Sequence, residues 1–428
     1  MKFYIYTLGC KLNIYESEAI SYILEKNGFK HTTNISEANY FIVNTCSVTT
    51  KASAKSRNII RGIKNKNKDA IVIVCGCLVQ TEEEILREIP EIDILIDNKN
   101  KINIIDAINK FNYFKNSKDK FYYKTEIDHS FDYELGELKN HSRAFIKIQD
   151  GCDNFCSYCQ IPLARGNSRS RKYEDIINEI TKIKENGYKE VVFTGVNIGN
   201  YNYNEINFSK LLDYVTDKFK DIRFRISSIE IQNIDSLFYE IIKKDNLCPH
   251  FHIPLQSGSD KILKLMNRKY TTTNYFEVVT KLRDIKKNPF IATDLIIGFP
   301  DESEEDFLET YDFIKKVDFS FIHVFGFSPR KGTKAFDMKP KIPERIRDLR
   351  IEKIIKLRDE MNLKYRKSFL NKCLPVIVEK KLSPTLFSSK ADNYLDILIR
   401  SDKILKSKEL YSIQLIEIDK DKNYGILI

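Results

Sequence analysis

Three cysteines in the middle of the chain, Cys152, Cys156 and Cys159, are spaced so that they could bind one metal centre. They follow the pattern C-x3-C-x2-C within eight residues, and a single tight loop can direct three such thiolates at one point. Four thiolates would close a cubane 4Fe–4S cluster, so three leave one iron open to a substrate or cofactor. The sequence therefore predicts an iron–sulfur cluster with one reactive corner.

A structural zinc site is the alternative interpretation of these cysteines. The fourth zinc ligand could be a histidine, and this half of the chain offers His141, His250 and His252. Structural zinc sites usually pair their ligands as C-x2-C with a second pair, and no second pair follows here. The unequal spacing thus favours the iron–sulfur cluster over zinc.

The composition indicates a folded protein of a reducing compartment. A length of 428 residues with 42% hydrophobic residues suits about three domains. The longest apolar run, residues 70–79, is shorter than the roughly 20 residues that a bilayer-spanning helix needs. Nine cysteines, an odd number without an evident export signal, favour metal ligands over disulfides. We therefore expect a cytoplasmic location and no contact with a membrane.

The net charge of +10 is concentrated in two stretches. Residues 51–68 contain seven basic residues and no acidic one before Asp69, and residues 339–372 contain 12 basic and 5 acidic residues. Two separate basic stretches suit a polyanion that contacts more than one domain. A solvated lysine-rich face is the alternative for either stretch alone.

The first third of the chain alternates strands and helices. We expect strands at 3–8, 40–43 and 70–75, and helices at 16–27, 52–63 and 81–88, which together predict a parallel, flavodoxin-like α/β sheet. Cys10, Cys46 and Cys77 each follow the end of one strand. Because that edge of a parallel sheet is one surface where ligands bind, the three cysteines should converge. Cys75 lies two residues from Cys77, so whether it can replace Cys77 stays open.

The central region repeats βα units and predicts a partial or complete (β/α) barrel. Strands are expected at 190–197, 224–230, 250–256, 292–300 and 321–325. Polar residues and glycines at the strand ends are the candidates for cofactor binding, with strand capping as the alternative for each one: Thr194, Gly195, Asn197, Ser228, Glu230, Gln256 and Asp294. His252 is more simply explained as a satisfied core histidine.

The last part predicts a long basic helix at 343–370 and then strands at 376–378, 395–399 and 412–416, which suit a small β-barrel. Residues 111–142 are polar without a clear period and suit an interdomain connection.

Several segments resemble one family. The cysteine loop with residues 161–166 (IPLARG) resembles the signature of radical S-adenosylmethionine enzymes, in the methylthiotransferase branch. Residues 7–13 (TLGCKLN), 44–49 (NTCSVT) and 76–80 (GCLVQ) resemble the N-terminal motifs of that branch. Residues 391–394 (ADNY) resemble the TRAM RNA-binding module, without the glycines expected beside them.

The resemblance implies two 4Fe–4S clusters. The cluster on Cys152, Cys156 and Cys159 would bind S-adenosylmethionine and cleave it to a radical, and an auxiliary cluster on Cys10, Cys46 and Cys77 would deliver sulfur. The strand-end candidates would line the S-adenosylmethionine pocket. The implied domains are residues 1–118 for the auxiliary cluster, 119–142 as a linker, 143–365 for the radical S-adenosylmethionine domain and 366–428 for the TRAM-like β domain.

The resemblance also implies the reaction, methylthiolation of carbon 2 in N6-threonylcarbamoyladenosine beside the anticodon of tRNA. S-adenosylmethionine would be both methyl donor and radical source, with an electron donor such as a flavodoxin or ferredoxin and a separate sulfur source. Alternatives are the enzyme for isopentenyladenosine in tRNA and the enzyme for an aspartate of a ribosomal protein. A non-catalytic, zinc-dependent RNA-binding protein is the alternative from another class.

Overall fold

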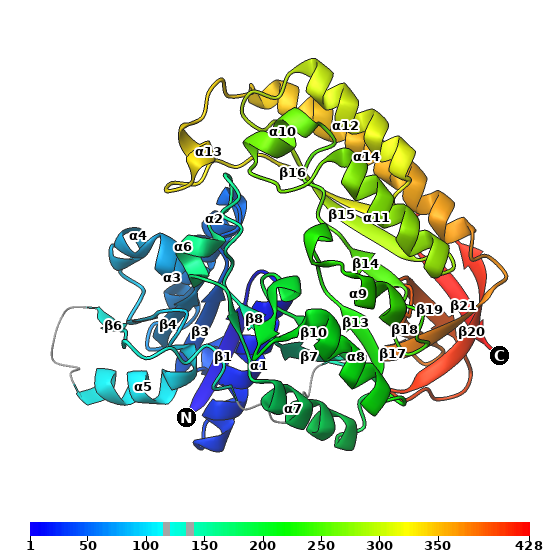
Figure 1. The fold of residues 1–428 in the computed structure, drawn as a ribbon. Coiled ribbons are helices and arrows are strands. Elements are labelled where there is room, and N and C mark those ends of the chain that lie inside the picture. The colour runs from blue at the N-terminus through cyan, green and yellow to red at the C-terminus, as the bar shows by residue number, and fades with distance from the viewer. Residues whose placement is uncertain (114–119, 134–140) are drawn as a thin grey trace. The chain divides into compact units, whose positions relative to one another are not determined.

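The computed structural model describes residues 1–113, 120–133 and 141–428, and the parts of the expected linker at 114–119 and 134–140 lie outside the described residues. The chain forms two compact units (Figure 1). Unit 1 contains Met1–Leu138, Asp150–Arg169 and Ser328–Phe336, and unit 2 contains Lys139–Gln149, Ser170–Phe327 and Asp337–Ile428. Short elements where the chain passes from one unit to the other are β8 (Gln149–Asp150), β9 (Arg169–Ser170) and α13 (Lys334–Asp337). Among the described residues, no helix has the length and apolar character needed to span a membrane.

Unit 1 is built on a parallel sheet, as the sequence predicts. Its strands pair in the order β2-β1-β3-β4-β5-β6, and every pairing is parallel. The strands are β1 (Lys2–Thr7), β2 (Lys30–His31), β3 (Tyr40–Thr45), β4 (Ile71–Gly76), β5 (Ile94–Ile96) and β6 (Phe121–Tyr123). Strand β6 lies within the segment expected to be a linker, because its three aromatic residues pair with β5 at the sheet edge.

Helices cover both faces of this sheet (Figure 1). One face packs on α1 and α5 around Phe3, Ile42 and Ile73, and the other packs on α2 around Val43 and Val74. The helices of unit 1 are α1 (Lys11–Lys26), α2 (Thr50–Lys66), α3 (Cys77–Thr81), α4 (Glu83–Arg87), α5 (Ile104–Tyr113) and α6 (Ile161–Arg165), with short η1 (Ile35–Glu37) and η2 (Lys101–Asn103). Helix α1 begins five residues before its predicted start, so that Cys10 is its N-cap residue.

Unit 2 contains the partial (β/α) barrel that the sequence predicts. Six strands run side by side in two parallel sheets, β7-β10-β13 and β14-β15-β16, and a parallel bridge between Ser228 and His252 joins β13 to β14. The strands are β7 (Ala144–Lys147), β10 (Glu190–Thr194), β13 (Arg223–Ile226), β14 (His250–His252), β15 (Phe290–Ile297) and β16 (Phe321–Gly326).

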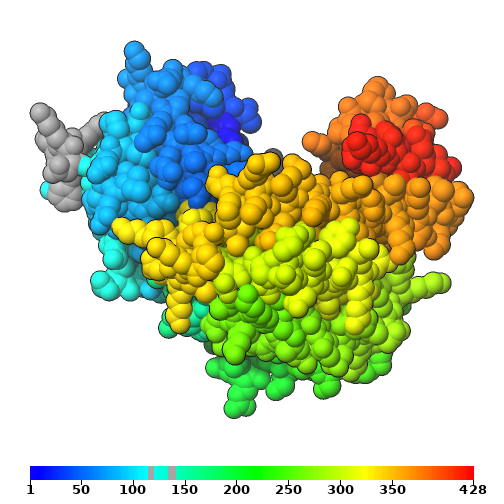
Figure 2. All heavy atoms as spheres, turned by 90° about the horizontal axis from the view of Figure 1, so that it is seen from above, coloured from blue at the N-terminus to red at the C-terminus, as the bar shows by residue number. Residues whose placement is uncertain are grey.

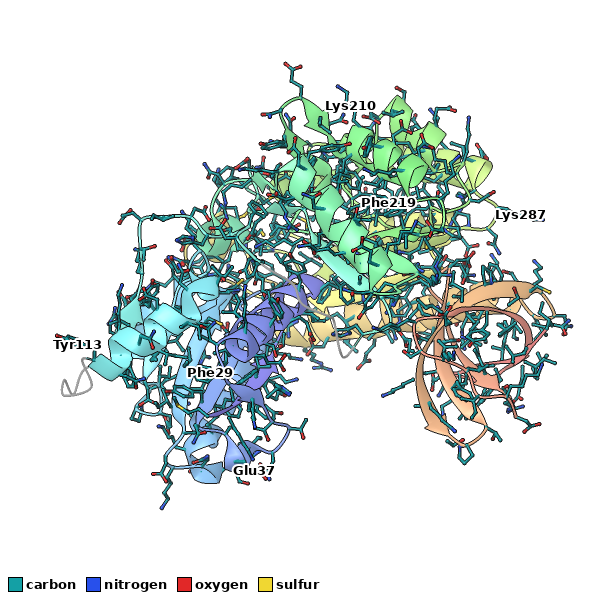
Figure 3. The ribbon with its side chains drawn as sticks, turned by 90° about the horizontal axis from the view of Figure 1, so that it is seen from below. Phe29, Glu37, Tyr113, Lys210, Phe219 and Lys287 are labelled. Carbon is teal, nitrogen blue, oxygen red and sulfur yellow. The ribbon has the colours of Figure 1, made fainter. Side chains whose placement is uncertain are left out.

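Helices form the outer layer of this barrel. The helices are α7 (Tyr173–Glu185), α8 (Phe208–Lys218), α9 (Ser236–Ile241), α10 (Asp260–Leu265), α11 (Thr272–Ile285), α12 (Glu304–Val317) and α14 (Glu344–Lys367), with short η3 (Ile198–Asn200), η4 (Ile231–Asn233), β11 (Asn202–Tyr203) and β12 (Ile206–Asn207). Helix α8 is typical of the layer, since Lys210 at its start is exposed and Phe219 just past its end is buried (Figure 3). In Figure 2 the orange α14 runs along the yellow-green α12.

The C-terminal segment of unit 2 is a closed barrel of five strands in the order β17-β18-β19-β21-β20. The strands are β17 (Cys373–Ser383), β18 (Leu386–Ala391), β19 (Asp396–Arg400), β20 (Leu410–Ile418) and β21 (Asn423–Leu427). The predicted β-barrel is therefore confirmed. Strands β18 and β21 were not predicted, because polar residues in LFSSKA and a glycine in NYGIL interrupt their apolar residues.

The turn before β19 fixes this β-barrel against the (β/α) barrel. The Arg225 guanidinium donates to the carbonyl oxygens of Asp392 at 2.8 Å and Ala391 at 3.0 Å, and the Tyr394 ring stacks on the His250 ring with centroids 4.1 Å apart. The buried carboxylate of Glu190 holds Arg225 from the other side, with its Oε1 2.7 Å from Arg225 Nε. The segment that resembles the TRAM motif, residues 391–394, thus packs against the (β/α) barrel.

Candidate active site

Cys10, Cys46 and Cys77 lie where the sequence predicts, just after the C-terminal ends of β1, β3 and β4, which are neighbours in the sheet. The chain turns sharply before Cys10 at Gly9, where φ is +99°. A Cβ on Gly9 would lie 2.8 Å from Cys46 Cβ and 3.0 Å from Cys46 Sγ, closer than side-chain carbons pack. The turn that carries Cys10 therefore passes directly against Cys46.

The three thiols act on one another electrostatically. Burial raises the pKa of Cys46 to about 11, and the nearby Cys77 and Cys10 add to the rise while Arg165 opposes it. A shared metal centre would lower the pKa of these thiols instead, because its positive charge stabilises the thiolates. Three adjacent soft ligands at one sheet edge, with no fourth cysteine among them, fit an iron–sulfur cluster with an open position.

The structure distinguishes Cys77 from Cys75. Cys75 is buried in the core on the face covered by α1 and α5, and burial raises its pKa to about 12. Gly76 turns the chain with φ of +103°, and a Cβ there would meet the Thr45 carbonyl oxygen at 2.4 Å. This turn, which only glycine can make, ends β4 and places Cys77 as the first residue of α3 at the edge.

Cys152, Cys156 and Cys159 lie on one compact loop of unit 1, and each is half-buried. A turn brings the Cys159 amide to the Cys156 carbonyl at 3.0 Å, and the Cys152 amide donates to the Gly166 carbonyl at 3.1 Å. The Ile161 amide donates to Cys159 Sγ at 3.4 Å, a contact that stabilises a thiolate. The donor set and its partial exposure fit a cluster that a small molecule can reach.

Arg165, at the end of α6, is the functional candidate that sequence reasoning missed. Its buried guanidinium donates two hydrogen bonds to the Glu16 carboxylate, at 2.9 and 3.1 Å. It also donates to the Asp150 carboxylate at 3.0 Å and to the Asn13 amide oxygen at 2.9 Å. Lys101, which has no exposed side-chain surface, bonds Glu16 from the other side at 2.5 Å. The network joins the helix that follows Cys10 to the loop that carries Cys152. The only sequence signal was the place of Arg165 in the family motif.

A second arginine anchors the cysteine loop from the segment Ser328–Phe336 of unit 1. Arg330 donates to the side chains of Gln160, next to Cys159, at 2.9 Å and Ser53 in α2 at 2.9 Å. Its burial and paired contacts identify Arg330 as a positioning residue for the loop.

In unit 2, the predicted residues Thr194, Gly195 and Asn197 lie together at the C-terminal end of β10. The Gln149 side-chain oxygen accepts from the amides of Val196 at 3.1 Å and Asn197 at 2.8 Å and so holds the turn. The Asn197 side chain is 5% exposed, and neither its oxygen nor its nitrogen has a hydrogen-bond partner among the described residues. A buried amide left in this state suits a ligand that supplies the missing partners.

Of the remaining predicted residues, Ser228, Glu230 and Gln256 follow the ends of β13 and β14, whereas Asp294 lies within β15. The Gln256 amide donates to the Asp294 carbonyl at 2.8 Å, and Ser228 pairs with His252. Glu230 contacts Arg268, and burial raises the pKa of Glu230 although Arg268 opposes it. Asp294 and His252 also influence that pKa, so these groups share one electrostatic environment.

His252 forms a cluster with Asp294 and His323, which differs from the expected histidine of the core. Its Nε2 lies 3.0 Å from an Asp294 carboxylate oxygen, and its ring stacks on His323 with centroids 5.3 Å apart. One ligand atom from each of these three residues lies within 4.8 Å of the others. Of the two cysteines outside the triads and Cys75, Cys248 is buried and Cys373 is exposed at the first residue of β17.

Two family profiles match the chain. The profile described as radical SAM superfamily matches residues 146–314, and the profile described as uncharacterized protein family UPF0004 matches residues 2–97. Among solved structures, the radical S-adenosylmethionine methyltransferase TsrM from Kitasatospora setae, with cobalamin and a 4Fe–4S cluster bound, aligns with a TM-score of 0.60 at 12% identity. That alignment covers 78% of this chain and 76% of TsrM, and it supports the fold alone.

Curated relatives match over nearly the whole chain. The threonylcarbamoyladenosine tRNA methylthiotransferase MtaB of Bacillus subtilis is 35% identical over 95% of this chain and 93% of its own length. The tRNA-2-methylthio-N(6)-dimethylallyladenosine synthase of Clostridium tetani is 33% identical over 92% of this chain and 90% of its own length. Radical chemistry on S-adenosylmethionine with a 4Fe–4S cluster is common to the superfamily that the first profile describes. The chain belongs to the radical S-adenosylmethionine methylthiotransferase family.

Proposed function

We propose that the chain methylthiolates carbon 2 of N6-threonylcarbamoyladenosine beside the anticodon of tRNA. The observation that carries the proposal is the convergence of Cys10, Cys46 and Cys77 at adjacent strand ends, in the same unit as the loop of Cys152, Cys156 and Cys159. Two relatives at 35% and 36% identity are named for threonylcarbamoyladenosine tRNA. An enzyme with two cysteine triads is favoured over a zinc-dependent RNA-binding protein.

We assign Cys152, Cys156 and Cys159 to a 4Fe–4S cluster that binds and cleaves S-adenosylmethionine, and Cys10, Cys46 and Cys77 to an auxiliary 4Fe–4S cluster. When bound, the two clusters supply one-electron reduction and sulfur for transfer. The residues of this chain hold the thiolates in place, and the buried guanidinium of Arg165 places a positive charge beside both cysteine segments. A protein electron donor such as a flavodoxin or ferredoxin and a sulfur source complete the proposed requirements.

We assign the S-adenosylmethionine pocket to Thr194, Gly195, Asn197, Ser228, Glu230, Gln256 and Asp294. Three features support this assignment: the buried amide of Asn197 lacks partners among the described residues, the half-buried Glu230 carboxylate pairs with Arg268, and both lie just past the carboxyl ends of barrel strands. Ligands of (β/α) barrels bind at that end.

The second candidate substrate is isopentenyladenosine in tRNA, because relatives named for N(6)-dimethylallyladenosine are 33–36% identical to this chain. The test is to incubate anaerobically reconstituted enzyme with S-adenosylmethionine, a reductant and two tRNA substrates, one carrying each modified adenosine. Nucleoside mass spectrometry should find methylthiolation of threonylcarbamoyladenosine only. Methylthiolation of isopentenyladenosine alone would assign the enzyme to that substrate instead. If neither tRNA is modified but an aspartate of a ribosomal protein is, the substrate is a protein.

A further inference from the structure

One face of the sheet in unit 1 is incompletely covered. Strand β2 has only two residues and is followed by the three-residue η1 before β3 begins. On the face where α2 lies, Tyr4 and Tyr6 of β1 therefore remain partly exposed. These two aromatic side chains pack against the core on this face and leave part of their surface open to a ligand.

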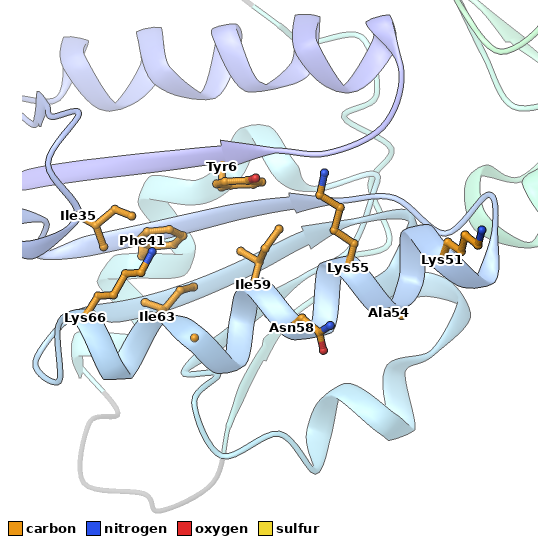
Figure 4. Close-up of a pocket in the computed structure, with 11 residues that line it drawn as sticks. Tyr6, Ile35, Phe41, Lys51, Ala54, Lys55, Asn58, Ile59, Ile63 and Lys66 are labelled. Atoms are coloured by element: carbon orange, nitrogen blue, oxygen red, sulfur yellow. The ribbon is translucent and has the colours of Figure 1, made fainter.

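A groove of about 580 Å³ lies between this face and α2. Its floor is formed by the partly exposed ring of Tyr6 and the buried ring of Phe41 (Figure 4). Tyr4 stacks on Phe41 with ring centroids 4.9 Å apart. Its wall is the side of α2 that carries Ile59, Gly62 and Ile63. The groove thus presents the Tyr6 ring beside the apolar residues of α2.

Lysines line the α2 side of this groove. Lys51, Lys55 and Lys66 belong to its lining and are exposed, and Figure 4 shows Lys55 and Lys66 reaching from α2 over the floor. At a rise of about 1.5 Å per residue, Lys51 and Lys66 are about 22 Å apart along the helix. The cations therefore extend along the groove instead of gathering at one point.

Two cations of α2 that do not line the groove are paired with carboxylates. Arg57 contacts Glu82, and Lys64 lies 3.0 Å from Asp93, so these cations are compensated. Within the part of the chain that the structure describes, Lys51, Lys55 and Lys66 form no ion pair with a carboxylate. A row of cations without carboxylate partners among the described residues, beside the partly exposed ring of Tyr6, complements an anionic, planar ligand.

We propose that this groove binds a single-stranded segment of RNA. An unpaired base would stack on the partly exposed ring of Tyr6, and the phosphates on either side would contact Lys51, Lys55 and Lys66. Single-stranded nucleic acids are bound in this way, by a basic groove that follows the backbone and aromatic side chains that stack on the bases. The proposal deepens the proposed function, because it rests on RNA as substrate and assigns it a binding surface outside both cysteine sites. An acidic protein would need a basic surface but no recessed aromatic floor.

The test measures binding of a fluorescein-labelled, single-stranded 12-nucleotide RNA and its duplex to the full-length reconstituted protein by anisotropy. Three groove variants probe three features: Tyr6→Leu removes the aromatic floor, Lys51→Gln/Lys55→Gln/Lys66→Gln removes the cations, and Gly62→Leu fills the groove, since a Cβ at Gly62 meets no atom within 4 Å. The matched control, Arg61→Gln/Lys68→Gln/Lys124→Gln, removes the same charge from exposed residues outside the groove lining.

Tyr6→Leu and Gly62→Leu should each weaken binding of the single strand about 5- to 100-fold. The lysine variant should weaken it at least about 10-fold and lower the slope of log K against log salt by about 2. The control should change affinity less than about 3-fold, and all variants should retain the wild-type iron content and unfolding temperature. Wild-type affinity in the groove variants, or equal losses in the lysine variant and its control, would overturn the proposal. Weakened binding of a poly-glutamate peptide with unchanged RNA binding would also overturn it and would indicate a protein partner.

The same variants separate this inference from the proposed function. If the wild-type enzyme methylthiolates tRNA, the groove variants should raise KM for tRNA more than they lower kcat. An unchanged KM would overturn the proposal that the groove binds RNA and leave the proposed function intact. If no tRNA is methylthiolated, the binding assay still decides whether the groove takes single-stranded RNA.

Discussion

The guanidinium of Arg165 faces the carboxylate of Glu16 in a two-point contact, with Nη1–Oε1 at 2.9 Å and Nη2–Oε2 at 3.1 Å, and both side chains are almost fully buried. Glu16 lies on the helix that begins at Cys10, and Arg165 follows the loop of Cys152, Cys156 and Cys159. Asp150 and Lys101 complete a group of two cations and two carboxylates. These buried ion pairs hold the helix that begins after Cys10 against the loop that carries Cys152, Cys156 and Cys159.

Arg165→Gln should lower the free energy of unfolding of unit 1 by about 3–5 kcal/mol, because two buried carboxylates lose a partner. Arg165→Lys should recover only part of this loss, since an ammonium cannot make the two-point contact. Chemical denaturation of the protein measures the effect. The control is Arg87→Gln, whose exposed pair with Glu83 should contribute at most about 1 kcal/mol. Equal effects of both substitutions would contradict the structural role of Arg165.

Cys77→Ala should reduce the iron bound per chain after anaerobic reconstitution, from about eight toward about four, whereas Cys75→Ala should leave about eight. Cys77 lies at the sheet edge with Cys10 and Cys46, and Cys75 is in the core. Iron and sulfide analysis provides the measurement, and Cys152→Ala/Cys156→Ala/Cys159→Ala should lower iron to about four independently. Iron loss in Cys75→Ala with normal iron in Cys77→Ala would exchange the two assignments. Zinc in place of iron would contradict both clusters.

Asn197→Ala should weaken S-adenosylmethionine binding about 5- to 100-fold while leaving the unfolding temperature unchanged, because the amide has no partner to lose among the described residues. Equilibrium dialysis with labelled S-adenosylmethionine measures the binding. Asn207→Ala is the matched control: Asn207 caps α8 by accepting from the Lys210 amide at 2.9 Å, so its loss should cost about 1 kcal/mol of stability without changing affinity. A loss of stability in Asn197→Ala with unchanged binding would identify Asn197 as structural.

Glu190→Gln should destabilise unit 2 at neutral pH. Burial alone would raise the pKa of Glu190, but Arg223 and Arg225, with Arg143, hold it well below its usual range. A depressed carboxylate pKa contributes stability above the unfolded pKa of about 4.3, and this contribution is lost as pH falls through the folded pKa. The difference in unfolding temperature between wild type and variant should therefore be constant from about pH 7 to 5.5 and shrink below about pH 4. A difference that disappears already at pH 6 would contradict the ion-pair assignment.

The sequence by itself determined the parallel sheet, the partial barrel and the cysteine positions, because short apolar runs that end in Gly-Cys or Asn-Thr-Cys mark strand ends on one sheet edge. It also indicated a small β-barrel after the long helix. Among the strands of the large sheet, the partial barrel and the β-barrel, it did not predict β2, β5, β6, β7, β18 or β21. These strands are short or lack a clear apolar pattern, and their formation depends on pairing with neighbouring strands.

Only the tertiary structure decided which groups meet across long sequence separations. Glu16 and Arg165 are 149 residues apart, and His252, Asp294 and His323 come from three strands, so no local pattern could have paired them. The turn at Gly76 separates Cys75 from Cys77, although alternation along a strand would place both on one face. The same holds for the lysines of α2, since sequence shows their number, but only their packing shows which are compensated and which line the groove.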